Sequence, residues 1–417
     1  MTTNRSPRPT RRPGRRAVAA LACATVLAGS TAAALATSAS AEGSAAAHRP
    51  DPAVQQVTRA VLASGASGYL TRIDDGRHVS TSAAGLADRA TGRALRPTDQ
   101  FEIGSNTKTF VSTLTLQEVA RGHLSLEDRL EKYFPGIVPN SKQITLRQLL
   151  QHTSGVFSYT ADAAFFQGME KNPQHVYTPR ELIAVANRHR PDFAPGTSWN
   201  YSNTNYVLIG MILEKVTGHS VAGLVQSRIA RPLGLRHTYY ADPRATATGP
   251  GYAHPYVAHL TGTTPTYQDM SDRPLGGWAD AAGAVISTSD ELARFFSALL
   301  GGKLVPPAQL AQMKTTVPLP KAFPIPGGYG LGLFRKDTPC GSVWGHGGDT
   351  LGHHTTAEVT DDGRRTAVTD TNTEPNEADG LVPGTQRFAR VAFAAEYASV
   401  CRMLDKPLPA SVANDLR

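Results

Sequence analysis

The sequence predicts an α/β fold of the α+β kind. An antiparallel sheet, built from both ends of the chain and flanked by helices, is interrupted by an inserted, mostly helical domain. Strand patterns occur early, over 68–74 and 79–84, and return late, between 283 and 371. Helical patterns fill most of the sequence between them. Strands separated by a run of helices are typical of a sheet domain that a second domain interrupts.

Local signals define the early elements. Apolar residues at helical spacing predict a helix over 52–64. The Asp75-Gly76 pair between two apolar runs predicts a hairpin of the strands 68–74 and 79–84. A third strand is expected near 100–103, directly before a helix that continues to Gly122.

Caps and helix breakers define the later elements. The clearest central helix is 204–217, which Gly218 ends, whereas 241–276 is rich in Pro, Gly, Thr and Ala and is expected to be a long loop. Thr288-Ser289-Asp290 caps a helix that continues to residue 300. Later strands are expected over 283–287, 330–334, 342–344, 355–360 and 366–371, followed by a final helix over 385–401.

These elements divide the chain into five parts. A sheet domain comprises 51–143 and 277–404, and a helical domain comprises 144–276, with the active site expected at their interface. The remaining parts are a signal peptide over 1–41, a flexible leader over 42–50 and a loose tail over 405–417.

The first 41 residues show the three parts of an export signal. Six arginines between residues 5 and 16 precede the weakly apolar run 17–35, and Ala39-Ser40-Ala41 forms a small-residue cleavage site. An uncleaved membrane anchor is the alternative, which the Ala/Thr/Ser-rich run disfavours. We therefore expect a secreted protein with no membrane anchor after cleavage, exported by either the Sec or the twin-arginine route.

The net charge of +8 comes mostly from this segment. Without its six arginines, 36 of the 42 basic residues remain, against 34 acids. Such a nearly even number of basic and acidic residues argues against nucleic acid as a partner. The chain lacks the C-x-x-C and H-E-x-x-H patterns, so we expect neither a metal nor a cofactor, and we expect a monomer.

Two cysteines lie beyond the signal, Cys340 and Cys401. In an oxidising compartment two such residues usually pair. We therefore predict a Cys340–Cys401 disulfide that ties the last helix to the start of a late strand. The alternative is a pair of buried free thiols.

The first chemical motif is Ser105-Asn106-Thr107-Lys108. Positions i and i+3 share one face of a helix, so the Ser105 hydroxyl and the Lys108 amine can touch. At the start of a helix, free backbone N–H groups favour developing negative charge. A hydroxyl nucleophile with an amine base needs this arrangement, although a lone S-x-x-K motif is more often an ordinary helix surface.

The second motif, Tyr201-Ser202-Asn203, precedes the helix 204–217 and can aim a phenol and an amide at one point. A tyrosine buried near an ammonium group loses its proton more easily and can act as a base. The alternative is a packed Tyr201 beside an Asn203 that caps the helix.

The third motif is His346-Gly347-Gly348-Asp349. Glycines at the end of a strand let a substrate backbone approach closely, and an N–H group there can donate to an oxyanion. His346 is expected to face the cleft. The alternative is a glycine-rich strand end with a structural histidine.

Together, S-x-x-K, Y-x-N and H-x-G in this order resemble the serine penicillin-recognising enzymes. Within them, the sequence is similar to the branch of Streptomyces-type serine D-alanyl-D-alanine carboxypeptidases and class C β-lactamases. The resemblance extends over residues 50–400 and includes Leu149–Gly155, Pro195-Gly196, 282–287 and 329–333.

The resemblance implies a role for each motif. Ser105 would attack a carbonyl group and become acylated, while Lys108 and Tyr201 would shuttle its proton. Asn203 would hold the substrate amide together with Lys108, and His346 would tune Tyr201. The remaining implied residues are Ser105 and Asp349, whose N–H groups would form the oxyanion hole, and the substrate-binding residues Trp278, Phe165, Gly347 and Gly348.

Three positions depart from the carboxypeptidase pattern. That branch usually has threonines where this chain has Gly347 and Asp349, and their hydroxyls help to hold the terminal carboxylate of the substrate. Phe334 stands where an arginine is expected, although Arg335 is adjacent. A carboxylate at Asp349 would repel a C-terminal carboxylate unless it points away or pairs with Arg335.

We therefore expect a secreted serine hydrolase that works through an acyl-enzyme on a small peptide or β-lactam, with D-alanyl-D-alanine carboxypeptidase as the leading activity. A β-lactamase, esterase or D-amino-acid amidase of the same fold is the first alternative, and a non-catalytic relative that binds cell-wall peptide is the second. A Ser/His triad is a further rival, because His152, His346 and the His353-His354 pair are available, although no G-x-S-x-G motif occurs. A Lys/Tyr pair predicts activity that survives mutation of every histidine other than His346.

Overall fold

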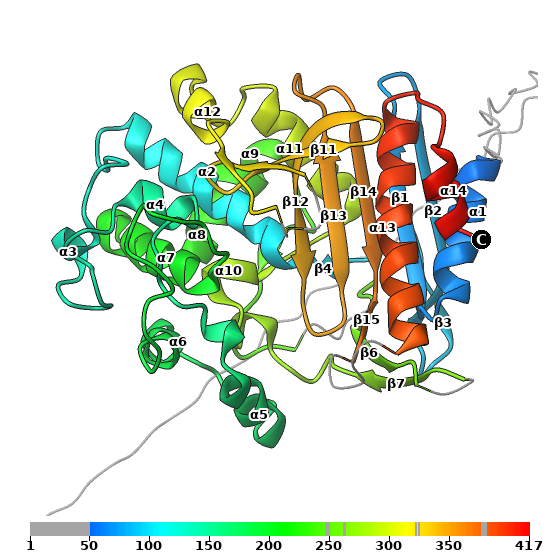
Figure 1. Cartoon of the computed structure of the whole chain (residues 1–417), viewed down its shortest axis with the longest axis horizontal. Helices are drawn as coiled ribbons and strands as arrows, with labels where there is room; N and C mark the ends of the chain where they lie inside the picture. The colour runs from blue at the N-terminus through cyan, green and yellow to red at the C-terminus, as the bar shows by residue number, and fades with distance from the viewer. Residues whose placement is uncertain (1–50, 247–250, 262–263, 322, 324–325, 377–381) are drawn as a thin grey trace, which may run out of the picture. The chain divides into compact units, whose positions relative to one another are not determined.

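A nine-stranded antiparallel sheet organises the computed structural model, and Figure 1 shows its long strands side by side with helices packed against them. The structure describes residues 51–246, 251–261, 264–321, 323, 326–376 and 382–417, and the predicted signal peptide and leader lie outside them. In spatial order, the strands are β3 (Arg93–Ala94), β2 (Val79–Asp88), β1 (Gly68–Asp74), β14 (Thr366–Thr371), β13 (His354–Val359), β12 (Gly341–Asp349), β11 (Phe334–Thr338), β10 (Gly327–Tyr329) and β9 (Val317–Pro318).

The two ends of the chain meet in this sheet. β1 pairs with β14, and their register runs from Tyr69 opposite Thr371 to Asp74 opposite Thr366. The predicted fold class, an antiparallel sheet built from both chain ends and flanked by helices, is thereby confirmed.

Two smaller sheets complete the strand structure. In one, β8 (Val285–Ser287) lies between β4 (Phe101–Glu102) and β5 (Tyr239–Tyr240). In the other, β6 (Tyr256–His259) pairs in parallel with β15 (Thr373–Pro375) and antiparallel with β7 (Thr266–Asp269). The β4–β8 pair matters for the site, because β4 leads directly into the Ser105 motif.

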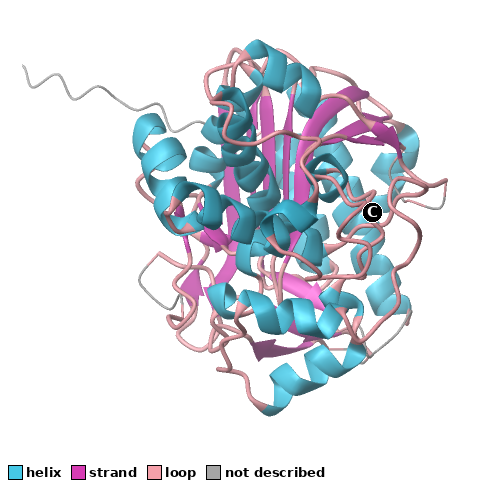
Figure 2. Ribbon diagram, turned by 90° about the vertical axis from the view of Figure 1, so that its left-hand side faces the viewer, coloured by secondary structure: helices cyan, strands magenta, loops and turns pink. Residues whose placement is uncertain are grey.

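Helices cover both faces of the large sheet (Figures 1 and 2). Neighbouring residues of a strand point to opposite faces, and in β14 Ala367 packs with Val400 of α13 (Pro383–Met403). Val368, one residue on, belongs to the cluster of Leu292 from α11 (Ser289–Leu300). α1 (Pro52–Ala63) and α14 (Ala410–Asp415) lie against α13.

The remaining helices build the part of the chain beside β12 and β11. The long ones, α2 (Thr107–Ala120) and α7 (Asn203–Thr217), contact each other and α10 (Asp280–Gly283). Among the described residues, no single helix is long and apolar enough to cross a membrane, although the bent pair 203–217 and 221–233 together meets that length and composition. The other helices are α3 (Leu130–Tyr133), α4 (Leu146–Leu150), α5 (Ala163–Lys171), α6 (Pro179–Ala186), α8 (Val221–Val225), α9 (Arg231–Leu233) and α12 (Pro307–Met313), with short turns η1 (Gly104–Asn106), η2 (Tyr159–Ala161), η3 (Gln226–Ala230) and η4 (Leu275–Gly277).

Three predicted elements were wrong. The segment 241–276 is not only a loop, because β6 and β7 form there through pairing with distant β15. Residues 330–333 form the turn between β10 and β11 instead of a strand. The tail 405–417 contains α14, whose Val412 and Leu416 are buried in a cluster with α13 residues. Contacts distant in sequence decided the first and third cases, whereas the turn at 330–333 is closed locally by the Gly330 N–H donating to the Leu333 carbonyl at 2.8 Å. The domain boundaries at 143/144 and 276/277 stay a prediction.

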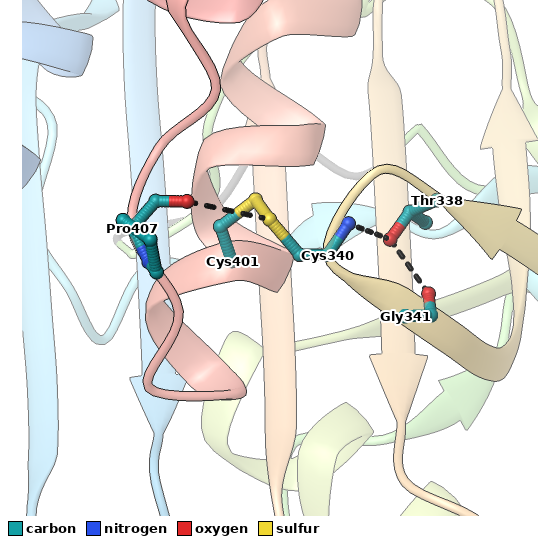
Figure 3. The surroundings of a disulfide bond; sticks show 5 residues. All are labelled: Thr338, Cys340, Gly341, Cys401 and Pro407. Atoms are coloured by element: carbon teal, nitrogen blue, oxygen red, sulfur yellow. Dashed lines mark hydrogen bonds between the residues drawn. A yellow bond between two sulfur atoms is a disulfide. The ribbon is translucent and has the colours of Figure 1, made fainter.

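The predicted disulfide is present, and Figure 3 shows it between Cys340 and Cys401. Its two Cα atoms lie 5.1 Å apart, and the bond joins the turn before β12 to helix α13 across 61 residues. The Thr338 hydroxyl donates to the Gly341 carbonyl at 2.7 Å and so closes the same turn. The disulfide therefore fastens the start of β12 to helix α13.

A charged group is buried between β11, β13 and α13. Lys336 Nζ donates to Glu358 Oε1 at 2.6 Å and to Glu396 Oε1 at 2.7 Å, and all three side chains are at most 5% exposed. Burial raises the pKa of Glu358 to about 8, which Lys336 partly opposes. Two carboxylates therefore share one ammonium group, and one of them holds a proton near neutral pH.

Candidate active site

Ser105 lies in η1, the tight turn between β4 and α2. The turn is fixed by Asn106, whose buried amide donates to the Ile103 carbonyl at 3.0 Å. A side chain at Gly104 would come within 2.8 Å of the Asp349 backbone nitrogen, and one at Gly348 within 2.0 Å of the Ile103 carbonyl. These glycines let the serine turn rest directly against the end of β12.

Lys108 lies one helical turn beyond Ser105 and is completely buried. Its Nζ atom lies 2.8 Å from Ser105 Oγ, 2.7 Å from Asn203 Oδ1 and 2.8 Å from the Ala282 carbonyl oxygen. The predicted Ser105–Lys108 contact is therefore present, and it is joined to the second motif through Asn203.

These contacts fix what the amine can do. Burial lowers the pKa of Lys108 well below its ordinary value, and the Asp349 charge opposes this only in part. The oxygens of Asn203 and Ala282 can only accept, so they take two N–H bonds of a neutral amine. Its lone pair then faces the Ser105 hydroxyl, as a general base requires.

Tyr201 lies beside this pair, with its ring centroid 4.8 Å from Lys108 Nζ. Burial raises the pKa of Tyr201 well above its ordinary value, and the nearby Ser105 hydroxyl only partly offsets this. Its buried hydroxyl has no hydrogen-bond partner among the described residues. The expectation that Tyr201 loses its proton more easily was therefore wrong, because a largely neutral Lys108 does not offset the cost of burying a phenolate. Tyr201 is suited to donate a proton.

Asn203 begins α7 and links the lysine to the helical region. Its Nδ2 donates to Thr160 Oγ1 at 2.8 Å, which leaves Oδ1 to accept from Lys108. Its backbone N–H donates to Ser158 Oγ at 3.0 Å. The amide is therefore oriented from two sides.

The end of β12 offers a backbone N–H beside Ser105. The Thr350 N–H donates to the His353 carbonyl within the β12–β13 hairpin. Because alternate residues of a strand bond to opposite sides, the Asp349 N–H points away from β13. The β11–β12 pairing ends with Phe334 opposite Gly345, so β11 does not pair with Asp349. The Asp349 N–H is thus directed away from β13, and the oxyanion hole that the resemblance implies for the Ser105 and Asp349 N–H groups stays a prediction.

The Asp349 side chain pairs with His354 instead of Arg335. Asp349 Oδ1 lies 2.6 Å from His354 Nδ1, and Glu374 Oε1 lies 3.5 Å from the same nitrogen. Arg335 is bound to Asp337 at 2.8 Å. Despite partial burial, the two carboxylates raise the pKa of His354 well above its ordinary value. The three ligand atoms lie within 4.8 Å of one another, a spacing that could also hold a metal ion.

His346 lies on β12 but does not face an open cleft. It is 1% exposed, and its Nε2 lies 3.0 Å from the Tyr329 hydroxyl. Burial, aided by Lys108, lowers the pKa of His346 to about 3, so the ring is neutral. Its ring centroid is 6.3 Å from that of Tyr201, so the implied tuning of Tyr201 stays a prediction.

The substrate-binding residues differ in their surroundings. Phe165 in α5 is 2% exposed and packs edge-on against Tyr159, so here it belongs to the core and does not line a cleft. Trp278 is also largely buried, and its carbonyl accepts from the Tyr159 hydroxyl at 2.9 Å. Gly347 has room for a side chain, because a Cβ atom there would meet its nearest atom, the Thr355 carbonyl oxygen, at an ordinary contact distance of 3.8 Å.

A buried histidine that the motifs did not identify supports the oxyanion hairpin. His353 Nδ1 lies 3.1 Å from Asp370 Oδ1, and its Nε2 lies 3.1 Å from the Ala253 carbonyl. Both ring nitrogens face acceptors, so His353 is held as an imidazolium, and Asp370 raises its pKa. Its position next to the H-x-G strand was the only sequence signal.

A serine whose hydroxyl contacts a buried lysine with a depressed pKa, beside a buried tyrosine and a free strand N–H, defines a serine hydrolase site. The sequence profile of the Beta-lactamase family matches residues 54–391. The chain belongs to the Beta-lactamase family of penicillin-recognising serine hydrolases.

Solved structures of similar proteins cover most of the chain. A D-stereospecific amidohydrolase from Streptomyces sp. is 40% identical, with a TM-score of 0.70 over 78% of this chain and 95% of the other. The D-amino acid amidase from Ochrobactrum anthropi SV3 is 25% identical, with a TM-score of 0.70 over 84% and 98%.

Among curated relatives, penicillin-binding protein 4* of Bacillus subtilis (strain 168) is 28% identical over 297 residues. The match covers 70% of this chain and 64% of the relative, so the chain spans less than two thirds of its length. The family thus includes relatives named for different substrates.

Proposed function

We propose that this protein is a secreted D-aminoacyl amidohydrolase that works through an acyl-enzyme at Ser105. The observation that carries the substrate class is the Asp349 carboxylate beside the oxyanion N–H, with His354 and not an arginine as its partner. The 40% identical D-stereospecific amidohydrolase supports the same choice.

In the first step, Ser105 Oγ attacks the carbonyl carbon of the amide and its proton passes to the neutral Lys108 amine, 2.8 Å away. The Ser105 and Asp349 N–H groups stabilise the oxyanion. As the C–N bond breaks, the leaving nitrogen takes a proton from Tyr201, which Lys108 reprotonates. Water then attacks the acyl ester at Ser105 and gives a proton to Lys108. Lys108 passes this proton to Ser105 Oγ as the ester bond breaks, which releases the carboxylic acid product and the free serine.

Charge argues against a carboxypeptidase substrate. Asp349, Glu374 and protonated His354 together carry one net negative charge, and the Asp349 side chain is 70% exposed. A like charge about 6 Å away costs on the order of 1–3 kcal/mol at the effective dielectric of a protein surface, whereas an ammonium group gains a similar amount. A substrate with a free α-ammonium group and an uncharged amide suits this field, and one with a C-terminal carboxylate does not.

The test compares D-phenylalanine amide, N-acetyl-D-alanyl-D-alanine and nitrocefin at equal enzyme concentration. We expect kcat/KM for the D-amide to exceed that for the carboxylate peptide at least tenfold, the lower end of this charge effect. Asp349→Thr should narrow the ratio by improving peptide turnover, while Asp415→Thr, an exposed acid in α14, should not change it. A wild-type preference for the peptide would instead restore the carboxypeptidase expectation.

Secretion and assembly are tested separately. N-terminal sequencing of protein recovered from the culture medium should begin at Glu42, and light scattering should give a monomer. A product that retains residues 1–41 or a larger assembly would contradict the respective prediction.

A further inference from the structure

His152 lies in the turn that follows α4, on the helical side of the site. It is completely buried, and its φ of 62° places a non-glycine residue in the left-handed region. Such a conformation is unfavourable for a residue with a side chain and persists only where the surroundings impose it.

Three contacts join His152 to the backbone around Tyr201. The His152 carbonyl accepts from the Asn200 N–H at 3.1 Å, and its ring Nδ1 accepts from the Ser202 N–H at 3.1 Å. Between these bonds, the His152 ring packs on the Tyr201 ring, with the centroids 4.3 Å apart. One residue therefore holds the residues on both sides of Tyr201 and the ring itself.

The hydrogen bonds also fix the tautomer of His152. Asn205 accepts from the Ser154 hydroxyl through Oδ1 at 2.7 Å, so its NH₂ group faces His152 Nδ1 at 3.2 Å. Two donors at Nδ1 require the proton on Nε2, which has no hydrogen-bond partner among the described residues. The charged and titratable groups that face the ring are Lys108 and His346, with Tyr201, Tyr206 and Tyr329 around it. The ring therefore remains neutral and acts by shape.

We propose that His152 is the positioning residue of Tyr201, holding the phenol beside Ser105 and Lys108 as a neutral clamp. His346 lacks this geometry, because its ring is 6.3 Å from Tyr201 and bonded to Tyr329. This inference rests on the proton-donor role of Tyr201 given under the proposed function, and it is independent of the amide specificity.

The test measures acylation by D-phenylalanine p-nitroanilide, an amide whose leaving nitrogen must take a proton, in the full chain, with pre-steady-state release of p-nitroaniline. His152→Asn keeps a side-chain acceptor and a residue that tolerates positive φ, but it removes the ring that packs on Tyr201. His152→Ala removes ring and acceptor together. We expect the acylation rate to fall about tenfold in His152→Asn and about a hundredfold in His152→Ala, as for a misplaced reacting group, with KM unchanged. His219→Asn, at an exposed histidine, should match the wild type.

A double-mutant cycle separates positioning from mere loss of stability. In a Tyr201→Phe background, His152→Asn should slow acylation less than threefold, because the proton donor it positions is already absent. The acid limb of the pH–rate profile should keep its midpoint in His152→Asn, because a neutral clamp does not titrate. Circular dichroism and thermal melting identify the folded variants, and if His152→Ala does not fold, His152→Asn alone decides.

Each outcome is decisive. Less than a fivefold loss in His152→Asn, or an equal loss with and without the Tyr201 hydroxyl, overturns the inference. If Tyr201→Phe itself acylates like the wild type, the proposed role of Tyr201 fails instead. If the double-mutant cycle gives the expected result but the wild type does not prefer the D-amide over the carboxylate peptide, only the proposed substrate is refuted.

Discussion

Replacing Lys108 with methionine tests the centre of the proposed mechanism. Methionine has similar length and an apolar end, so it can occupy the completely buried volume of the lysine. The change removes the lone pair that faces the Ser105 hydroxyl at 2.8 Å. It also leaves Asn203 Oδ1 and the Ala282 carbonyl without their donor. The variant should therefore lose activity and some stability.

The two effects can be sized separately. A positioned general base contributes about 10²- to 10⁴-fold, so acylation should slow by that factor, about 3–5 kcal/mol in barrier. Each buried acceptor left unpaired costs about 1–3 kcal/mol, and removing a buried amine returns part of this. We expect the free energy of unfolding to fall by about 1–4 kcal/mol. A stable protein tolerates that loss, so the rate effect can be measured on folded enzyme.

The assay is single-turnover acylation with p-nitrophenyl acetate between pH 5 and pH 10. In the wild type, the rate should rise with pH through an acid limb below the ordinary lysine value, because the lowered pKa of Lys108 makes the amine neutral there. The pH–rate profile of Lys108→Met should lack this acid limb. Lys108→Arg keeps a charge but cannot act as a base, so its acylation rate should be as low as that of Lys108→Met. Lys303→Met changes an exposed lysine and is the control. Acylation by folded Lys108→Met within tenfold of wild type would refute the base assignment.

Three further predictions concern stability. Cys401→Ser, compared with Ala398→Ser on the same helix, should lower the free energy of unfolding by about 2–4 kcal/mol, because the disulfide closes a 61-residue loop; an unchanged denaturant midpoint would contradict this. The ion pairs of Glu118 lower its pKa from 4.5 to about 2, so they stabilise the folded protein above pH 4.5. This contribution, about 3 kcal/mol at most, is lost as the pH falls toward 2. Urea unfolding of the wild type and Glu118→Gln should therefore converge at low pH, and parallel curves would argue against it. Lys336→Met should destabilise the fold by about 3–5 kcal/mol, since Glu358 and Glu396 lose their shared cation; a melting temperature equal to that of Lys303→Met would refute it.

Much of the fold was predictable because its signals are local. The helices around 52–64 and 204–217 carry their own caps and breakers, including the N-terminal Asp51 and the C-terminal Gly218 in the left-handed conformation. The hairpin strands pair as their turn residues require. By contrast, β6 and β7 depend on β15, more than a hundred residues away in sequence, and α14 depends on the apolar surface of α13. No local pattern contains those partners.

The site divides in the same way. Residue types and their spacing identified Ser105, Lys108 and Tyr201, because a helical turn brings the first two together and the Tyr201 turn begins a helix. Burial, which the motifs do not report, lowers the pKa of Lys108 and raises that of Tyr201, and this supports the proposed roles of the lysine as base and the tyrosine as proton donor. It also decided that Phe165 belongs to the core.

By itself, the sequence predicted the fold class, the disulfide partners and the contact between Ser105 and Lys108, because these follow from local periodicity, residue count and helical geometry. Only the tertiary structure decided that Asp349 pairs with His354, that the His152 ring packs on Tyr201 and that both ring nitrogens of His353 face acceptors. These three choices depend on which side chains meet across distant segments and on how little water reaches them. Contact and desolvation set charge and orientation, and neither is a property of a short stretch of chain.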